Sequence, residues 1–76
     1  MHVDILTPDT TLFSGEATIV TLPGAQGSFQ IKNNHAPLIS ALAAGKVVIG
    51  NGNEKQEFAV KGGIVEVLKN RIVILA

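Results

Sequence analysis

The sequence contains no cysteine, few aromatic residues and little charge of either sign. Without cysteine, no disulfide can stabilise the chain and no thiolate can bind a metal. Lysine plus arginine number 6, as do aspartate plus glutamate, so the basic excess typical of proteins that bind nucleic acid or anionic membranes is missing. No apolar run approaches the roughly 18 residues of a membrane-spanning helix, and no signal-peptide pattern opens the sequence. These absences predict a soluble chain in a reducing compartment, with no nucleic-acid partner and no direct membrane insertion.

The chain is short as well as weakly charged. Its 76 residues predict one small domain, residues 1–76, that buries only about 60% of its unfolded surface. Charged residues make up 16% of the chain, against about 25% in an average soluble domain. A small domain with so few charges is expected to cover part of its surface with a partner.

Short runs of alternating or β-branched residues, separated by turn residues, extend along the whole sequence. Ser28 to Lys32 alternates apolar and polar side chains, as a half-buried strand does. Pro23-Gly24 has the residue order of a type II turn, and Gly50 to Asn53 is a hairpin signal. About eight to ten short strands with a turn signal at each corner predict an all-β fold, either an antiparallel β-sandwich or a small barrel.

Two features near the C-terminal end predict a local irregularity and a covered strand. Gly62-Gly63 interrupts a strand pattern, which predicts a bulge or a close approach of two backbones. Ile72 to Leu75 is apolar on both faces, although one face of an antiparallel sandwich normally meets water. We therefore expect a partner to cover this strand, with another strand or a further segment as the alternatives.

The sequence nominates no catalytic, cofactor-binding or metal-binding residue. His2 and His35 lie far apart, with no carboxylate or cysteine at ligand spacing. The serines and threonines near the N-terminus lack an accompanying histidine-acid constellation or oxyanion signature. Gly24 to Gly27 could suggest a phosphate-binding loop, but no lysine-serine pair follows, and turn glycines are the better interpretation. We expect no cofactor and no catalysis by the chain itself.

Several motifs together carry a family resemblance. In order along the chain they are Leu12-Phe13-Ser14-Gly15, the Gly24 to Gly27 loop, His35-Ala36-Pro37-Leu38, Gly45, Gly62-Gly63-Ile64-Val65-Glu66-Val67 and Val73-Ile74-Leu75-Ala76. Each motif alone is weak, whereas the combination is specific and covers nearly the whole chain. It resembles the N-terminal β-sandwich of the epsilon subunit of F-type ATP synthases.

The resemblance implies an all-β domain, an antiparallel β-sandwich of about ten short strands in two sheets. It also implies a non-catalytic rotor subunit in the central stalk of a proton-translocating ATP synthase. Such a subunit binds the gamma subunit and the ring of membrane subunits, and so couples ion flow to ATP synthesis. The expected location is the cytoplasmic face of the bacterial inner membrane, peripheral through the complex, with the plastid thylakoid as the alternative.

The resemblance implies roles for particular residues. Thr7, His35 and Ser40 match positions on the gamma-facing side of the family's domain. The family's ring-facing loop corresponds here to Gly24, Ala25, Gln26, Gly27 and Ser28. Many family members carry an acidic residue where this chain has Ser28, so we expect hydrogen bonds and shape to replace a charge contact with the ring. The alternative for each position is a purely structural role as a turn, strand or strand-edge residue.

Longer family members continue into a two-helix hairpin that can restrain ATP hydrolysis and, in some, bind ATP. This sequence stops at Ala76, so we expect no C-terminal helical domain and no ATP binding or inhibition through such a segment. A natural short form and a truncated chain would look the same in the sequence.

Two functions from other classes are the alternatives. A small all-β carrier of the biotinyl or lipoyl type would have a similar length and density of strands. Such a carrier exposes a lysine at the tip of a tight hairpin, and Lys69 is the only candidate, although its neighbours Leu68 and Asn70 do not match the carrier motif. A small hydrolytic enzyme would require titratable groups that converge in a pocket, and it ranks last.

Overall fold

The computed structural model describes Met1 to Ala76 as nine β-strands without a helix. The strands are β1 (His2–Leu6), β2 (Thr11–Glu16), β3 (Ile19–Gly24), β4 (Gly27–Lys32), β5 (Leu38–Leu42), β6 (Gly45–Asn51), β7 (Glu54–Val60), β8 (Gly63–Leu68) and β9 (Arg71–Leu75). The predicted all-β class is therefore confirmed, with nine strands in place of about ten.

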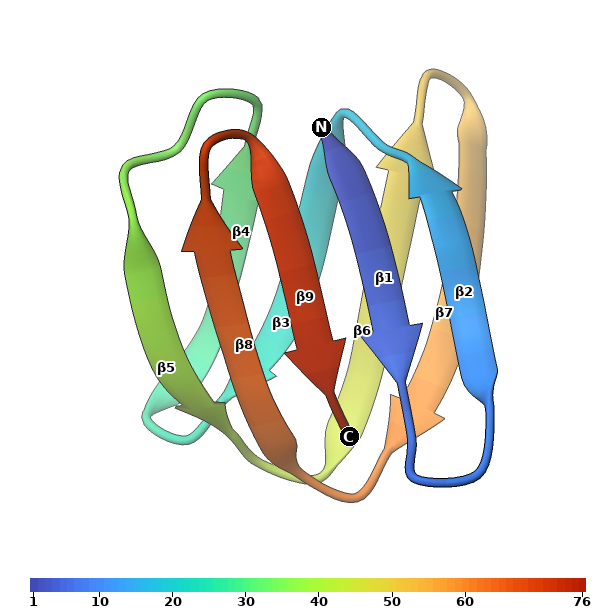
Figure 1. The fold of residues 1–76 in the computed structure, drawn as a ribbon, viewed down its shortest axis with the longest axis vertical. Coiled ribbons are helices and arrows are strands. Elements are labelled where there is room, and N and C mark those ends of the chain that lie inside the picture. Colours follow the sequence, from blue (N-terminus) through green and yellow to red (C-terminus); the bar gives the residue numbers. More distant parts are fainter.

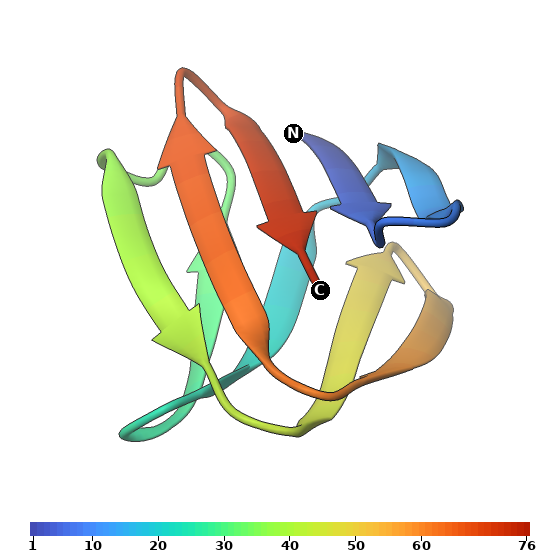
Figure 2. The same cartoon turned by 60° about the horizontal axis from the view of Figure 1, so that its bottom comes forward.

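The strands form one continuous sheet that folds into two layers. Its order is β2-β1-β9-β8-β5-β3-β6-β7, and β4 pairs with β3. One layer contains β5, β8, β9, β1 and β2, and the other lies behind it with β4, β3, β6 and β7 (Figure 1). The turned view keeps β3 and β4 behind β5 and β8 (Figure 2). At one side the strands of the two layers pair through a single residue pair between β3 and β5, Gly24 with Leu42. The fold is therefore a nearly closed sandwich.

One neighbouring pair departs from the antiparallel arrangement that the sequence predicts. β1 and β9 pair in parallel, from His2 opposite Arg71 to Leu6 opposite Leu75. A tight hairpin forces two consecutive strands to run antiparallel, whereas strands joined by a long connection are free to run parallel. β1 and β9 are separated by all the other strands, so no turn dictates their relative direction.

The core lies between the two layers and consists of inward-facing aliphatic side chains. Ile5, Ile72 and Ile74 come from one layer and meet Leu22 and Ile31 of the other, all of them fully buried. Burial of such a side chain stabilises the fold by about 1.5–3 kcal/mol. Phe13 of β2 and Phe58 of β7 pack with ring centroids 5.6 Å apart, which closes the side of the sandwich where β2 and β7 end the sheet.

The turn predicted at Pro23-Gly24 is wrong. Both residues belong to β3, and the turn lies at Ala25-Gln26, where β3 and β4 are connected. Gly24 is needed for close packing instead, because a Cβ there would lie 2.5 Å from the Gly27 carbonyl oxygen and 2.8 Å from the Phe29 ring. The signal at Gly50 to Asn53 is confirmed as the β6–β7 hairpin.

The Gly62-Gly63 interruption is confirmed as a close approach of two backbones. Gly62 and Gly63 have φ values of 131° and 132°, a region that only glycine adopts readily. A Cβ on Gly63 would collide with the carbonyl oxygen of Leu75. The start of β8 is thereby held directly against the end of β9.

Candidate functional site

The outer face of the layer that contains β5, β8 and β9 is unusually apolar. Five large hydrophobic residues are exposed in the whole chain, and four of them lie on this face: Ile39 at 70%, Ile64 at 49%, Leu68 at 51% and Leu75 at 54%. Strand register places Ile64 opposite Leu75, and Ala41 opposite Ile64. We call the surface formed by Ile39, Ile64, Leu68 and Leu75, with the half-buried Val73 between β8 and β1, the apolar outer face.

The double-sided hydrophobicity of Ile72 to Leu75 is explained in part by this layer. Ile72 and Ile74 enter the core, whereas Val73 is half-buried and Leu75 is exposed. Both edges of β9 pair with β1 and β8, and its inner face is covered by the core between the two layers. The outer side of the strand is open, and its cover by a partner stays a prediction.

Two shallow grooves mark the apolar outer face. One, of about 390 Å³, is lined by Glu66, Leu68, Lys69, Arg71 and Val73. The other, of about 410 Å³, is lined by Pro37, Leu38, Ile39, Glu66, Val67 and Leu68. Glu66 and Leu68 line both grooves and therefore form the ridge between them.

The loop from Gly24 to Ser28 lines a third groove, of about 510 Å³. Phe29, Ser40 and Ala41 complete its walls. The amide of Ala25 donates a 3.1 Å hydrogen bond to the carbonyl of Ala41, which fixes the loop against β5. The structure thus brings Ser40, a predicted gamma-facing residue, next to the predicted ring-facing loop.

The three predicted gamma-facing residues are not brought together. Thr7 lies in the β1–β2 turn and His35 in the β4–β5 connection, at opposite ends of the sandwich (Figure 1). The Thr7 hydroxyl accepts a 3.0 Å hydrogen bond from the Thr10 amide and donates to the Thr10 carbonyl at 3.1 Å. The exposed ring of His35 donates through Nδ1 to the Ala36 carbonyl, 2.6 Å away. The structure therefore gives Thr7 and His35 local roles, and their interface roles stay predictions.

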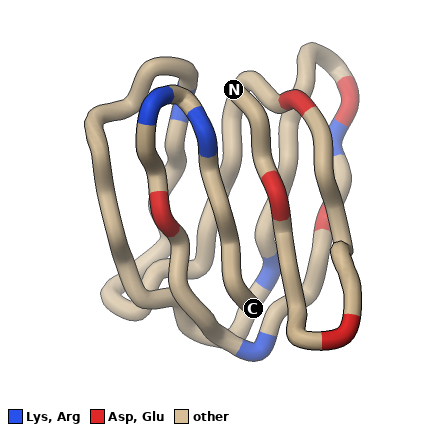
Figure 3. Tube along the Cα trace, in the orientation of Figure 1, with Lys and Arg blue, Asp and Glu red and all other residues tan.

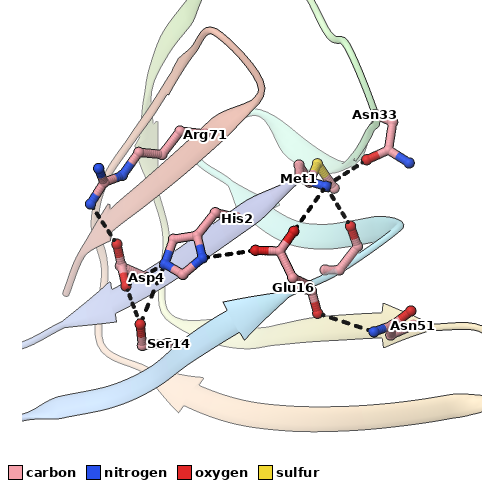
Figure 4. A network of polar contacts seen from close by, with 9 residues as sticks. Met1, His2, Asp4, Ser14, Glu16, Asn33, Asn51 and Arg71 are labelled. Atoms are coloured by element: carbon pink, nitrogen blue, oxygen red, sulfur yellow. Dashed lines mark hydrogen bonds and ion pairs between the residues drawn. The ribbon is translucent and has the colours of Figure 1, made fainter.

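A polar cluster on β1, β2 and β9 was missed by the sequence reasoning (Figure 4). The Asp4 carboxylate accepts hydrogen bonds from Ser14 Oγ at 2.6 Å, from Arg71 at 3.0 Å and from His2 Nε2 at 3.2 Å. The bond from Ser14 is the main cause of a lowered Asp4 pKa; Arg71 and His2 add to it, while burial opposes it. His2 and Asp4 stand two positions apart, so they share one face of a strand, and this spacing was the available signal.

His2 is the second residue of this cluster with a shifted pKa. Its Nδ1 lies 2.9 Å from a carboxylate oxygen of Glu16, and this hydrogen bond is the main cause of a raised His2 pKa. Desolvation works in the opposite direction, and the contact with Asp4 adds to the increase. A protonated His2 on β1 is therefore joined to β2 through the Glu16 carboxylate and also contacts Asp4 of its own strand.

Ser14, His2 and Glu16 stand in the order of a hydrolase triad, with Ser14 Oγ 3.4 Å from His2 Nε2. The serine proton, however, is directed to Asp4 at 2.6 Å, which leaves His2 without a nucleophile to deprotonate. None of the grooves described above includes Ser14 or His2. The cluster is accordingly a structural connection between strands and does not form a hydrolytic site.

Three further features bear on metal binding, membrane crossing and the carrier alternative. No group of three or more histidine and carboxylate side chains is arranged to hold a metal ion. The fold contains no helix that is long and apolar enough to cross a membrane. Lys69 does lie at the tip of a tight hairpin, with φ values of 50° at Lys69 and 60° at Asn70, which is the position that the carrier alternative requires.

Solved structures of ATP synthases have the same fold. A chain from the mitochondrial ATP synthase of Euglena gracilis superposes with a TM-score of 0.89 at 18% identity, covering 97% of this chain and 48% of that one. A chain from the central stalk and c-ring structure of the Tetrahymena thermophila mitochondrial enzyme superposes with a TM-score of 0.82 at 22% identity. The match covers 97% of this chain and 60% of that one. Identities this low show likeness of fold alone.

Sequence comparison is more specific. The ATP synthase epsilon chain of Chlorobium limicola is 43% identical over 74 residues, covering 96% of this chain and 84% of the relative. That of Caulobacter vibrioides is 38% identical over 76 residues, covering 100% and 88%. The Salinibacter ruber epsilon chain is 37% identical, and this chain spans 57% of its length. A family model described as the β-sandwich domain of the ATP synthase delta/epsilon chain matches residues 1–76, and the chain therefore belongs to the ATP synthase epsilon-chain family, as the sequence motifs indicated.

Proposed function

We propose that this chain is a non-catalytic rotor subunit of a proton-translocating ATP synthase. In this role it binds the gamma subunit and the ring of membrane subunits and couples ion flow to ATP synthesis. It works at the cytoplasmic face of a bacterial inner membrane or at its plastid counterpart, held there by the complex. Membership of the epsilon-chain family supports the assignment.

The observation that carries the proposal is the apolar outer face. Four of the five exposed large hydrophobic residues gather on it, whereas hydrophobic residues on a free surface are normally scattered singly. The cores of stable protein interfaces are rich in such side chains and poor in charge. We assign this face to the gamma subunit.

The groove between the Gly24 to Ser28 loop and β5 is the proposed contact with the membrane ring. It lies at the turn end of the β3–β4 hairpin and includes Ser40 as well as Ser28. Neither serine carries a charge, and the loop exposes Ala25, Gln26 and Gly27. Hydrogen bonds from backbone and hydroxyl groups then make the contact with the ring. In this proposal Ser40 contributes to the contact with the ring as well as to the contact with gamma.

A rigid sandwich suits the transmission of torque. The core residues are close-packed, and such interiors have low compressibility. No chemical step within the chain is required, because rotation passes through two packed surfaces.

Binding to a separately produced gamma subunit tests the proposal. The 76-residue chain is immobilised, the gamma subunit is passed over it, and retention is measured for the wild type and for His35→Glu. Retention of gamma by the wild type is expected, and no retention at micromolar concentration would overturn the assignment. Equal retention by His35→Glu would remove His35 from the interface and leave the function in place. An intact mass without a biotinyl or lipoyl adduct after expression would dispose of the carrier alternative at Lys69.

A further inference from the structure

Glu66 is the one carboxylate within the apolar outer face. It lies in the middle of β8, opposite Ile39 of β5 and Val73 of β9. Its side chain is exposed, and it takes part in none of the side-chain hydrogen bonds and ion pairs of the chain. Figure 3 shows this acidic position on β8, apart from the basic positions at the β8–β9 turn. A carboxylate among exposed aliphatic side chains is therefore left without a partner.

The nearby cations do not neutralise Glu66. Arg71 lines the same groove as Glu66, but its guanidinium donates to Asp4 at 3.0 Å. Lys69 is held at the hairpin tip, where its φ is 50°, and it forms no ion pair within 4.0 Å. In the free domain the Glu66 carboxylate is therefore hydrated and has no cationic partner within the chain.

Covering this face with a partner changes the situation of Glu66. An apolar partner surface would remove water from the carboxylate, and burying an unpaired charge in this way is strongly unfavourable. A guanidinium or ammonium group opposite the carboxylate offsets this cost through charge-assisted hydrogen bonds. A second copy of this chain is a poor occupant, because a symmetric contact centred on the face would bring two Glu66 carboxylates together.

We propose that Glu66 is the polar anchor of the apolar outer face and pairs with an arginine or lysine of the gamma subunit. The inference rests on the function proposed above and adds the chemistry of the contact. The grooves on either side of Glu66 and Leu68 give a long cationic side chain room to lie along Leu68 while its charged end reaches the carboxylate. Glu66 thereby fixes the register of gamma on the face, which aliphatic contacts alone would leave free to slide.

The test compares the affinity for the gamma subunit of the wild type, Glu66→Gln, Glu66→Lys and Leu68→Asp. Glu54→Gln is the matched control, because Glu54 begins β7 in the other layer and also has no ion pair. Loss of the charge in Glu66→Gln is expected to weaken binding about tenfold, and charge reversal in Glu66→Lys about a hundredfold. Glu54→Gln should bind as the wild type does. Raising the salt concentration should weaken the wild type more than Glu66→Gln.

The outcomes separate this inference from the proposed function. No binding by the wild type contradicts the proposed function itself. Wild-type binding that is lost in Leu68→Asp but unchanged in Glu66→Gln keeps the gamma contact and overturns the anchor. Stronger binding by Glu66→Lys would show that gamma presents an acidic surface here, which also overturns it. Sedimentation of the free chain as a dimer through this face would assign the surface to a second copy and contradict the pairing with gamma.

Discussion

Arg71 of β9 donates a 3.0 Å hydrogen bond to Asp4 of β1, across the parallel strand pair that joins the two ends of the chain. The two residues are 67 positions apart, and no hairpin holds their strands side by side. The same carboxylate also accepts a hydrogen bond from the Ser14 hydroxyl of β2. Asp4 therefore connects three neighbouring strands of one layer.

The lowered pKa of Asp4 predicts a loss of stability in acid. A carboxyl group whose folded pKa lies below its unfolded value stabilises the fold above the unfolded pKa, and this contribution is lost as the pH falls through the folded pKa. Thermal unfolding of the wild type should therefore show a falling midpoint below about pH 3.8, the ordinary pKa of an aspartate. Asp4→Asn should have a lower midpoint at neutral pH and a weaker acid dependence. A variant with the wild-type midpoint at pH 7 would show that the cluster contributes nothing.

The raised pKa of His2 predicts the opposite dependence. A histidine whose folded pKa exceeds its unfolded value stabilises the fold at low pH, and this contribution disappears as the pH rises above about 6.5 through the folded pKa. The unfolding midpoint should fall slightly between pH 6 and pH 8.5 in the wild type, and less in His2→Gln. If His2→Gln keeps the wild-type slope, the contacts with Glu16 and Asp4 have no net effect.

Ile74 reports on the core between the layers. Its side chain is fully buried, so Ile74→Ala should reduce the free energy of unfolding by about 2–5 kcal/mol through lost burial and the cavity left behind. Ile39→Ala should change it by about 0.5 kcal/mol or less, because Ile39 is 70% exposed. Denaturant unfolding measures both. Similar losses in the two variants would contradict the assignment of Ile39 to the outer face.

Gly63 tests the close approach of β8 and β9. An alanine there would take a φ of 132° and place its Cβ against the Leu75 carbonyl. Backbone strain alone should cost about 1–3 kcal/mol in the free energy of unfolding. Gly52→Ala is the comparison, since Gly52 has a φ of 65° and open space around its Cβ position. A larger loss in Gly52→Ala than in Gly63→Ala would rule out this account of the Gly63 contact.

The sequence predicted features that depend on neighbouring residues better than those that depend on distant ones. The β6–β7 hairpin and the Gly62-Gly63 approach were predicted because turn residues and glycine carry their geometry locally. The parallel β1–β9 pair and the Asp4–Arg71 contact were not, because strand partners far apart in sequence leave no periodic signal. The turn at Pro23-Gly24 was misplaced because Gly24 serves packing against Phe29, and composition does not distinguish that role from a turn.

For the candidate site, the motifs identified the family, and the structure added the surfaces. Ile39, Ile64 and Leu68 are exposed on one face because of the register across β5, β8 and β9. That register cannot be read from the sequence pattern. The predicted set of Thr7, His35 and Ser40 came from resemblance alone. The structure places Ser40 beside the 24–28 loop and the other two at opposite ends of the sandwich.

The most direct test of the central claim is the affinity for the gamma subunit of Leu68→Asp and Leu12→Asp. Both residues are exposed leucines, at 51% and 37%, but Leu12 lies on β2 at the end of the sheet, in a groove with Ala59 and Val60 of β7. Circular dichroism confirms first that both variants are folded. The account predicts that Leu68→Asp loses binding by about a hundredfold or more while Leu12→Asp binds within about threefold of the wild type. Equal affinities for the wild type and Leu68→Asp would contradict the assignment of this face to gamma.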